Sequence, residues 1–234
     1  MHQADQVTVE LTMAIKDGDV PALERLLAAR PGLAAERITG RKGGTSTPLH
    51  IVTDWPGYFP NGPAIVRILI EAGADPNALT SPGNPETPLH YAASSDDADV
   101  AEALINGGAD LEVPGGSIGT PLDNAVGYGC WHVARLLVAR GAQVDKLWHA
   151  AALGLLPRLE ELIVAGPAAE ELNEAFWQAC HGAKRRAAEL LLNQGADPVR
   201  IPGYASGQTP VEVAGALDTR RENLVGWLRE RTGA

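Results

Sequence analysis

The stretch that decides the fold is ETPLHYAASSDDADVAEALINGGADLE, residues Glu86–Glu112, because the chain contains shorter versions of it several times. Its opening returns as TPLHIVTD from Thr47, TPLDNAVG from Thr120 and TPVEVAGA from Thr209. Its ending returns as GADPN from Gly73, GAQVD from Gly141 and GADPV from Gly195. Recurrence at a period of roughly 33 residues indicates stacked copies, in which each copy covers the apolar face of its neighbour.

Each copy contains the signals of two short helices. A threonine such as Thr87 is a good N-cap, and the proline after it suits the first helical position. Glu212 completes a capping box with Thr209. A pair of small residues, as in Ala92–Ala93, lets two helices approach closely. The second helix ends in an apolar triplet, and a glycine such as Gly195 follows it, as expected for a left-handed C-cap.

The combination of TPLHxAA and GAD at matched offsets resembles the ankyrin repeat, from about Thr8 to Arg231, in single-domain proteins of the bacterial type. The resemblance implies an all-α solenoid of about seven helix-turn-helix repeats, with short β-hairpin fingers and a concave groove that binds partners. Most relatives do not catalyse reactions. We expect a single domain over residues 1–234, with repeats at about 8–40, 46–79, 86–113, 119–145, 146–172, 173–200 and 208–232.

Two departures from the repeat pattern carry information. The connectors before Lys146 and Glu174 are short, which predicts two shortened fingers and a notch opening onto the fifth and sixth repeats. The fingers SPGNPE, PGGSIG and RIPGYASGQ are expected at full length. In the second repeat, an insertion between Thr53 and Ile70 brings in several aromatic residues. These either fold over their own repeat or line a binding surface.

The family pattern places the two residues after each small pair in the groove. It therefore predicts a row made of Asp54–Trp55, Ser94–Ser95, Gly127–Tyr128, Leu153–Gly154 and His181–Gly182. The candidate binding residues are Asp54, Trp55, Tyr58, Phe59, Tyr91, Asn124, Tyr128, Trp131, Trp148, His149, Trp177 and His181. Trp148 and Trp177 have an alternative role as core residues, and His181 has one as a solvated residue at a helix end.

The resemblance implies structural roles for His50, His90 and His149, which hold the motif position that bonds backbone and threonine across the turn. Asp123 replaces this histidine and is predicted to cap a nearby backbone N–H. Histidines at this spacing do not form a metal site, and Cys130 and Cys180 suggest neither a disulfide framework nor a zinc finger. We assign no catalytic residue, metal or cofactor.

The chain has 234 residues, of which 19 are basic and 29 acidic, giving a formal charge of −10. This balance argues against nucleic-acid binding and favours partners with a basic patch. No long apolar run indicates a membrane span or a secretory signal. We expect a cytoplasmic, monomeric protein-binding adaptor that uses its concave groove.

The alternative is a small-molecule or catalytic pocket at the notch between the fourth and sixth repeats, with the Trp55–Phe59 loop as a lid. Its walls would be Tyr128, Trp131, Trp148, His149, Trp177 and His181.

Overall fold

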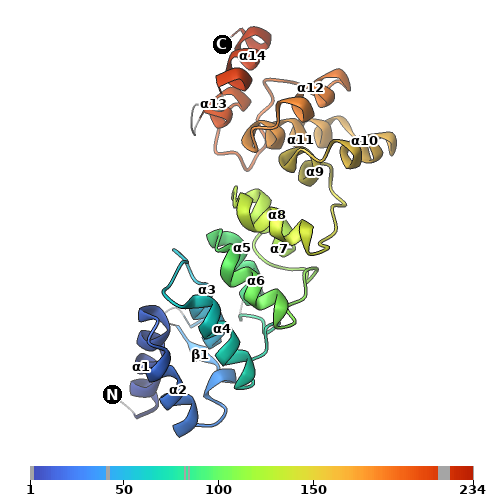
Figure 1. Cartoon of the computed structure of the whole chain (residues 1–234). Coiled ribbons are helices and arrows are strands. Elements are labelled where there is room, and N and C mark those ends of the chain that lie inside the picture. Colours follow the sequence, from blue (N-terminus) through green and yellow to red (C-terminus); the bar gives the residue numbers. More distant parts are fainter. Residues whose placement is uncertain (1–2, 41–42, 82, 84, 216–221, 234) are drawn as a thin grey trace. The chain divides into compact units, whose positions relative to one another are not determined.

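The computed structural model describes residues 3–40, 43–81, 83, 85–215 and 222–233, and the regular secondary structure within these ranges is helical apart from one short hairpin (Figure 1). The finger predicted before Thr87 includes Pro82 and Asn84, and the predicted repeat 208–232 includes residues 216–221. These positions lie outside the described residues. The chain packs into two compact units, residues 1–142 and 143–234, which we call the N-terminal and C-terminal units.

The N-terminal unit contains four helix pairs in two layers. Helices α1, α3, α5 and α7 contact one another in series, and α2, α4, α6 and α8 form a second series behind them. This arrangement is the predicted solenoid, because every pair buries its apolar faces against the next pair. The elements are α1 (Gln3–Asp17), α2 (Val20–Ala29), a 3-10 turn (Leu33–Ala35), α3 (Pro48–Thr53), α4 (Gly62–Glu71), α5 (Pro88–Ser95), α6 (Ala98–Asn106), α7 (Pro121–Gly127) and α8 (Trp131–Ala139).

One finger of the N-terminal unit forms a short antiparallel hairpin of β1 (Ile38–Thr39) and β2 (Thr45–Ser46). Thr45 also forms a β-bridge with Ser81 of the following finger. Successive fingers are therefore joined through backbone hydrogen bonds as well as through their helices.

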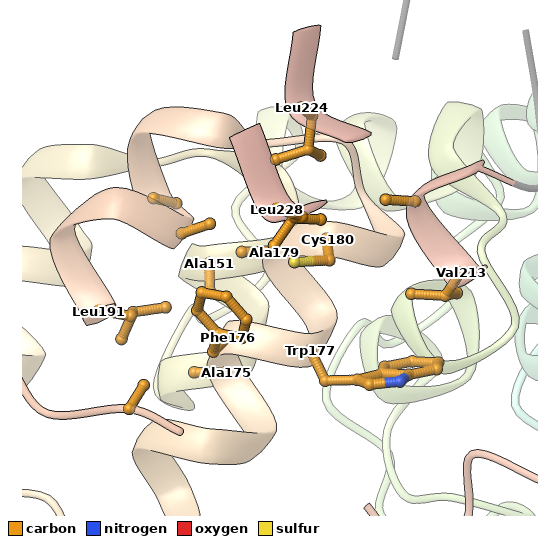
Figure 2. Packing of buried hydrophobic residues seen from close by; sticks show 14 of the residues in the cluster. Ala151, Ala175, Phe176, Trp177, Ala179, Cys180, Leu191, Val213, Leu224 and Leu228 are labelled. Atoms are coloured by element: carbon orange, nitrogen blue, oxygen red, sulfur yellow. The ribbon is translucent and has the colours of Figure 1, made fainter. Parts of the chain in front are cut away.

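The C-terminal unit repeats the two-layer plan with three pairs. Helices α9, α11 and α13 contact one another in series, and α10 packs on α12. A cluster that includes Ala151, Phe176, Trp177, Leu191 and Leu228 forms its core (Figure 2). The elements are α9 (Leu147–Leu153), α10 (Leu156–Val164), α11 (Ala169–His181), α12 (Arg185–Asn193), α13 (Pro210–Gly215) and α14 (Glu222–Thr232).

The predicted helix signals are confirmed by the hydrogen bonds. Thr87 Oγ1 accepts from the His90 N–H at 3.4 Å, and Thr209 and Glu212 exchange the two bonds of a capping box at 2.8 and 3.2 Å. The predicted stop glycines Gly73 and Gly195 both have φ of +97°, the left-handed conformation that favours glycine.

Two of the motif histidines, His50 and His90, link their repeat to the next. Nδ1 of His50 accepts from the Thr47 N–H at 3.2 Å, so the ring proton is on Nε2, which donates to the Glu86 carbonyl at 3.0 Å. His90 reaches the Gly119 carbonyl at 2.9 Å in the same way. Asp123 takes the histidine's local role, because its carboxylate accepts from the Thr120 N–H at 2.7 Å. The predicted structural roles of these side chains are confirmed.

The shortened finger before the sixth repeat is confirmed, with a helix boundary that differs from the prediction. Only residues 165–168 separate α10 from α11, and α11 begins at Ala169, before the predicted repeat start at residue 173. The Glu171 carboxylate accepts from the Ala168 N–H at 2.8 Å and stabilises an added first turn. Helix therefore replaces most of the finger here.

Candidate functional site

A cleft of about 300 Å³ lies on the first-helix side of the N-terminal unit. Residues from three of the predicted groove pairs contribute to it, because α3, α5 and α7 pack side by side. Its lining combines aromatic side chains, which we call the walls, with polar ones, which we call the floor. The lining residues are Asp54, Trp55, Glu86, Tyr91, Ser94, Ser95, Ser117 and Tyr128.

The aromatic walls differ in exposure. Trp55 is 77 % exposed and Tyr128 is 52 % exposed, whereas Tyr91 is half-buried. The Tyr91 ring meets the edge of His50 at 5.1 Å between centroids, and the Tyr128 hydroxyl lies 3.0 Å from Ser117 Oγ. The cleft therefore has two tyrosines held by defined contacts and a tryptophan that presents most of its surface to solvent.

The inserted loop that carries Trp55 is bonded to the repeats on either side of it. Toward the preceding repeat, Asn61 donates to the Gly18 carbonyl at 2.9 Å, and a Cβ on Gly18 would lie 2.4 Å from the Pro60 carbonyl oxygen, so only glycine fits there. Toward the following repeat, the Tyr58 N–H donates to Asp97 at 2.7 Å, and the Tyr58 hydroxyl donates to the Asp96 carbonyl at 2.5 Å. The loop is thus a fixed rim of the cleft.

Phe59 and Tyr58 lie on this rim without lining the cleft itself. The ammonium of Lys16 stands 5.6 Å from the centre of the Phe59 ring, which places Phe59 against α1. Tyr58 is 65 % exposed. Phe59 thus packs on the preceding repeat, which differs from both alternatives for the loop aromatics, and Trp55 lines the cleft.

Asn124 lies beneath the cleft and joins three of its parts. Its side chain is fully buried; the amide donates to Glu86 Oε1 at 3.0 Å and to Ser94 Oγ at 3.2 Å. Its oxygen accepts from the Ile118 N–H at 3.3 Å. Glu86 Oε1 also accepts from the Ser117 N–H at 3.0 Å. Asn124 therefore positions the carboxylate and the finger, because a buried amide is stable only when its polar atoms are bonded.

The cleft has a negative electrostatic character. Burial raises the pKa of the Tyr91 hydroxyl, and the carboxylates of Glu86 and Asp54 raise this pKa further. Negative charge close to a phenol opposes its ionisation, so the part of the shift that Glu86 and Asp54 cause, beyond the larger effect of burial, is what a negative field at the hydroxyl produces. The lining contains no Lys or Arg among the described residues.

A second cleft, of about 500 Å³, lies in the C-terminal unit beside the short connector 165–168. Lys146, Trp148, Glu171 and Glu174 line it, together with Leu147 and Leu162. Burial raises the pKa of Glu174, the nearby Glu170 and Glu171 raise it further, and a hydrogen bond from Tyr204 lowers it. The Lys146 ammonium stands 5.7 Å from the centre of the Trp148 ring.

The other predicted residues of the C-terminal unit lie elsewhere. His149 is 1 % exposed, and Trp177 is 5 % exposed within the core cluster of Figure 2, where its indole N–H donates to the Gln208 carbonyl at 2.9 Å. His181 closes α11, half-buried, with its ring 5.2 Å from that of Trp177. Of the predicted residues Trp148, His149, Trp177 and His181, only Trp148 lines the second cleft. In the N-terminal unit, Trp131 begins α8 and is half-buried.

Some residues that line the two clefts were not among the candidate binding residues predicted from the sequence. Glu86 precedes the Thr87 cap in a finger, and its position over the cleft depends on the long-range bond to Asn124. The sequence feature that could have identified Glu86 is its place next to the motif threonine, where a side chain can turn over the first helix. Glu174 and Glu171 stood at a repeat boundary whose helix begins earlier than expected.

Covalent chemistry by the cysteines does not fit their surroundings. Burial raises the pKa of Cys130 to about 11 and also raises that of Cys180, which keeps both as thiols at neutral pH. Within the described ranges, no three His, Cys, Asp or Glu side chains cluster closely enough to hold a metal ion. None of the helices so described has the length and apolar character to cross a bilayer.

Comparison with known proteins gives consistent matches. A family model described as "Ankyrin repeats (3 copies)" matches residues 49–146. The mouse B-cell lymphoma 3 protein homolog is 28 % identical over 80 % of this chain and 44 % of its own length. The human B-cell lymphoma 3 protein is 31 % identical over 58 % of this chain and 29 % of its own length. The chain thus spans less than half the length of these relatives.

Solved structures give the same fold. The ankyrin repeat domain of Bcl-3, described as a unique member of the IkappaB protein family, matches with a TM-score of 0.55 and 27 % identity, over 94 % of this chain and 97 % of that one. The human ASB11 ankyrin repeat domain matches with a TM-score of 0.55 and 20 % identity, over 96 % and 98 % of the two chains, and shows the fold alone.

Proposed function

The chain is an ankyrin-repeat protein, and we propose that it is an adaptor that binds a protein segment in the cleft between α3, α5 and α7. Ankyrin repeat domains generally mediate contacts between proteins, so an interaction role is consistent with the family. The single observation that carries the proposal is the set of Trp55, Tyr91 and Tyr128 around one cleft, contributed by three successive repeats.

The exposure of these aromatic rings supports a partner rather than a core role. Trp55 buries less than a quarter of its surface and Tyr128 about half, which leaves apolar area that a partner can cover. Aromatic residues on a rigid frame are typical anchors of interfaces, because little side-chain entropy is lost when the partner binds. The bonds of the loop at Gly18 and Asp97 provide such a frame.

The test is selection of peptides from a random phage-displayed library on the full chain, followed by calorimetry of the selected peptides. We expect Trp55→Ala and Tyr128→Ala to weaken binding at least about tenfold while leaving the melting temperature unchanged. Val9→Ala is the matched control, since Val9 is 49 % exposed on α1 and does not line the cleft. Selected peptides that bind all three variants as tightly as the parent chain would rule out this groove.

The second cleft favours a second candidate function, the binding of a small molecule at the shortened finger. Its volume of about 500 Å³ is within the range of ligand sites, and it combines an aromatic wall with a lysine and carboxylates. Trp148 gives a direct reporter. A metabolite that occupies this cleft should change the intrinsic fluorescence of the parent chain but not of Trp148→Phe. If no member of a metabolite panel produces such a difference, the candidate is rejected.

A further inference from the structure

We infer that the cleft of the N-terminal unit contains a subsite for the guanidinium group of an arginine side chain, carried by the bound segment between Trp55, Tyr91 and Tyr128. This inference rests on the proposed function and adds the chemistry of the partner. Three independent features of the cleft support it: the hydrogen-bonding state of its floor, the charge around it and the faces of its walls.

The floor of the cleft offers acceptors. The Ser94 hydroxyl donates its proton to the His90 carbonyl at 2.9 Å, and the Ser95 hydroxyl donates to the Tyr91 carbonyl at 3.0 Å. A hydroxyl has one proton, so what remains for a ligand on these two serines is oxygen lone pairs, one of which on Ser94 already accepts from Asn124. A ligand that contacts these serines must therefore bring donors, and guanidinium has five donors and no acceptor.

The charge around the cleft is negative. Asp54 and Glu86 are the charged groups in its lining, and both are acidic. Asp54 Oδ1 accepts from the Trp55 N–H at 2.9 Å, and Glu86 accepts from the Ser117 N–H and the Asn124 amide on the same oxygen, Oε1. A cation is the complementary ligand.

The walls favour a planar cation over a compact one. Tyr91 is fixed against the edge of His50, Tyr128 is fixed by Ser117, and Trp55 is mostly uncovered. Guanidinium stacks on such rings while its edge donates to carboxylates, whereas an ammonium keeps more of its water. Residues of three successive repeats line the cleft, so the side chain belongs to a segment lying across these repeats.

The experiment uses the full chain labelled with ¹⁵N and follows the indole N–H signal of Trp55 by NMR, assigned through Trp55→Phe. The added compounds are N-acetyl-L-arginine N-methylamide and the citrulline analogue, which has the same shape without the charge. We expect the arginine compound to shift the signal saturably and to bind about tenfold more tightly than the citrulline compound. Asp54→Asn should weaken the arginine compound severalfold, and added salt should weaken it as well.

Asp110→Asn is the control, because it removes one carboxylate charge from a finger outside the cleft, and it should leave the arginine compound's affinity unchanged. Equal binding of the two compounds, or no shift of the Trp55 signal with the arginine compound, would overturn the subsite. The protein-binding groove and the arginine subsite can be rejected independently of each other. Selected peptides that lose binding in Trp55→Ala but tolerate replacement of every basic residue would retain the groove and reject the arginine subsite.

Discussion

Acidification should destabilise the protein through His50 by an amount that the structure sets. His50 is 1 % exposed, and burial lowers its pKa from 6.5 to about 4. Nearby Arg37 and His90 lower the pKa as well, while Glu86, through its carboxylate and its backbone carbonyl, raises it. The folded chain therefore keeps the ring neutral in a pH range where the unfolded chain binds a proton.

The sign and size of this change in the free energy of unfolding follow from proton linkage. Between pH 6.5 and about 4 the unfolded state carries one more proton at this site, so stability falls as the pH is lowered. Each pH unit in this window costs about 1.4 kcal/mol, and the whole window costs about 3 kcal/mol. Above pH 6.5 and below about pH 4 this contribution does not change with pH.

The assay is urea unfolding of the parent chain and of His50→Gln at pH 7, 6, 5 and 4. Glutamine keeps a donor and an acceptor but does not titrate, and both chains have the same carboxylates, so the difference between their unfolding free energies isolates His50. We expect the parent's advantage to shrink by about 3 kcal/mol from pH 7 to pH 4. Two parallel curves would refute the claim that burial holds this ring neutral.

Three further changes have outcomes that urea unfolding can measure. Phe176→Ala should cost about 3–5 kcal/mol, because Phe176 is fully buried in the C-terminal core; a loss below about 1 kcal/mol would contradict that placement. Gly182→Ala should destabilise by about 1–3 kcal/mol, since its Cβ would lie 2.0 Å from a carbonyl oxygen of α9, whereas Gly203→Ala, with nothing within 4 Å, should be neutral. Asp96→Ala should cost about 1–2 kcal/mol because Asp96 Oδ1 accepts from two N–H groups at the start of α8, and Asp96→Asn should retain most of this; equal losses would disprove the capping role.

The sequence predicted those parts of the fold whose causes are local. The cap at Thr87, the stop at Gly73 and the role of Asp123 each depend on groups within four residues along the chain. Their energies do not depend on the rest of the molecule, so a pattern of residue types was sufficient. The position of three groove pairs in one cleft followed as well, because repetition of one unit places equivalent residues side by side.

The sequence did not predict features that depend on contacts between repeats. Nothing near Tyr58 in the chain indicates its bonds to Asp96 and Asp97, which lie in the next repeat. Trp177 illustrates the same limit, since an aromatic residue at a groove-facing position and one in a core have the same local pattern. The Gln208 carbonyl that accepts from its indole N–H lies in a later finger, and this contact explains its burial.

The chemistry of the cleft follows from the repeat itself. The groove residues come near the ends of short first helices, within reach of the carbonyls one turn earlier. In α5, the Ser94 and Ser95 hydroxyls donate to the His90 and Tyr91 carbonyls, so their protons are used within the helix. Serines at these groove positions therefore offer acceptor oxygens to a ligand. Carboxylates at Asp54 and Glu86 then make a donor-rich cation the ligand with the most bonds to gain.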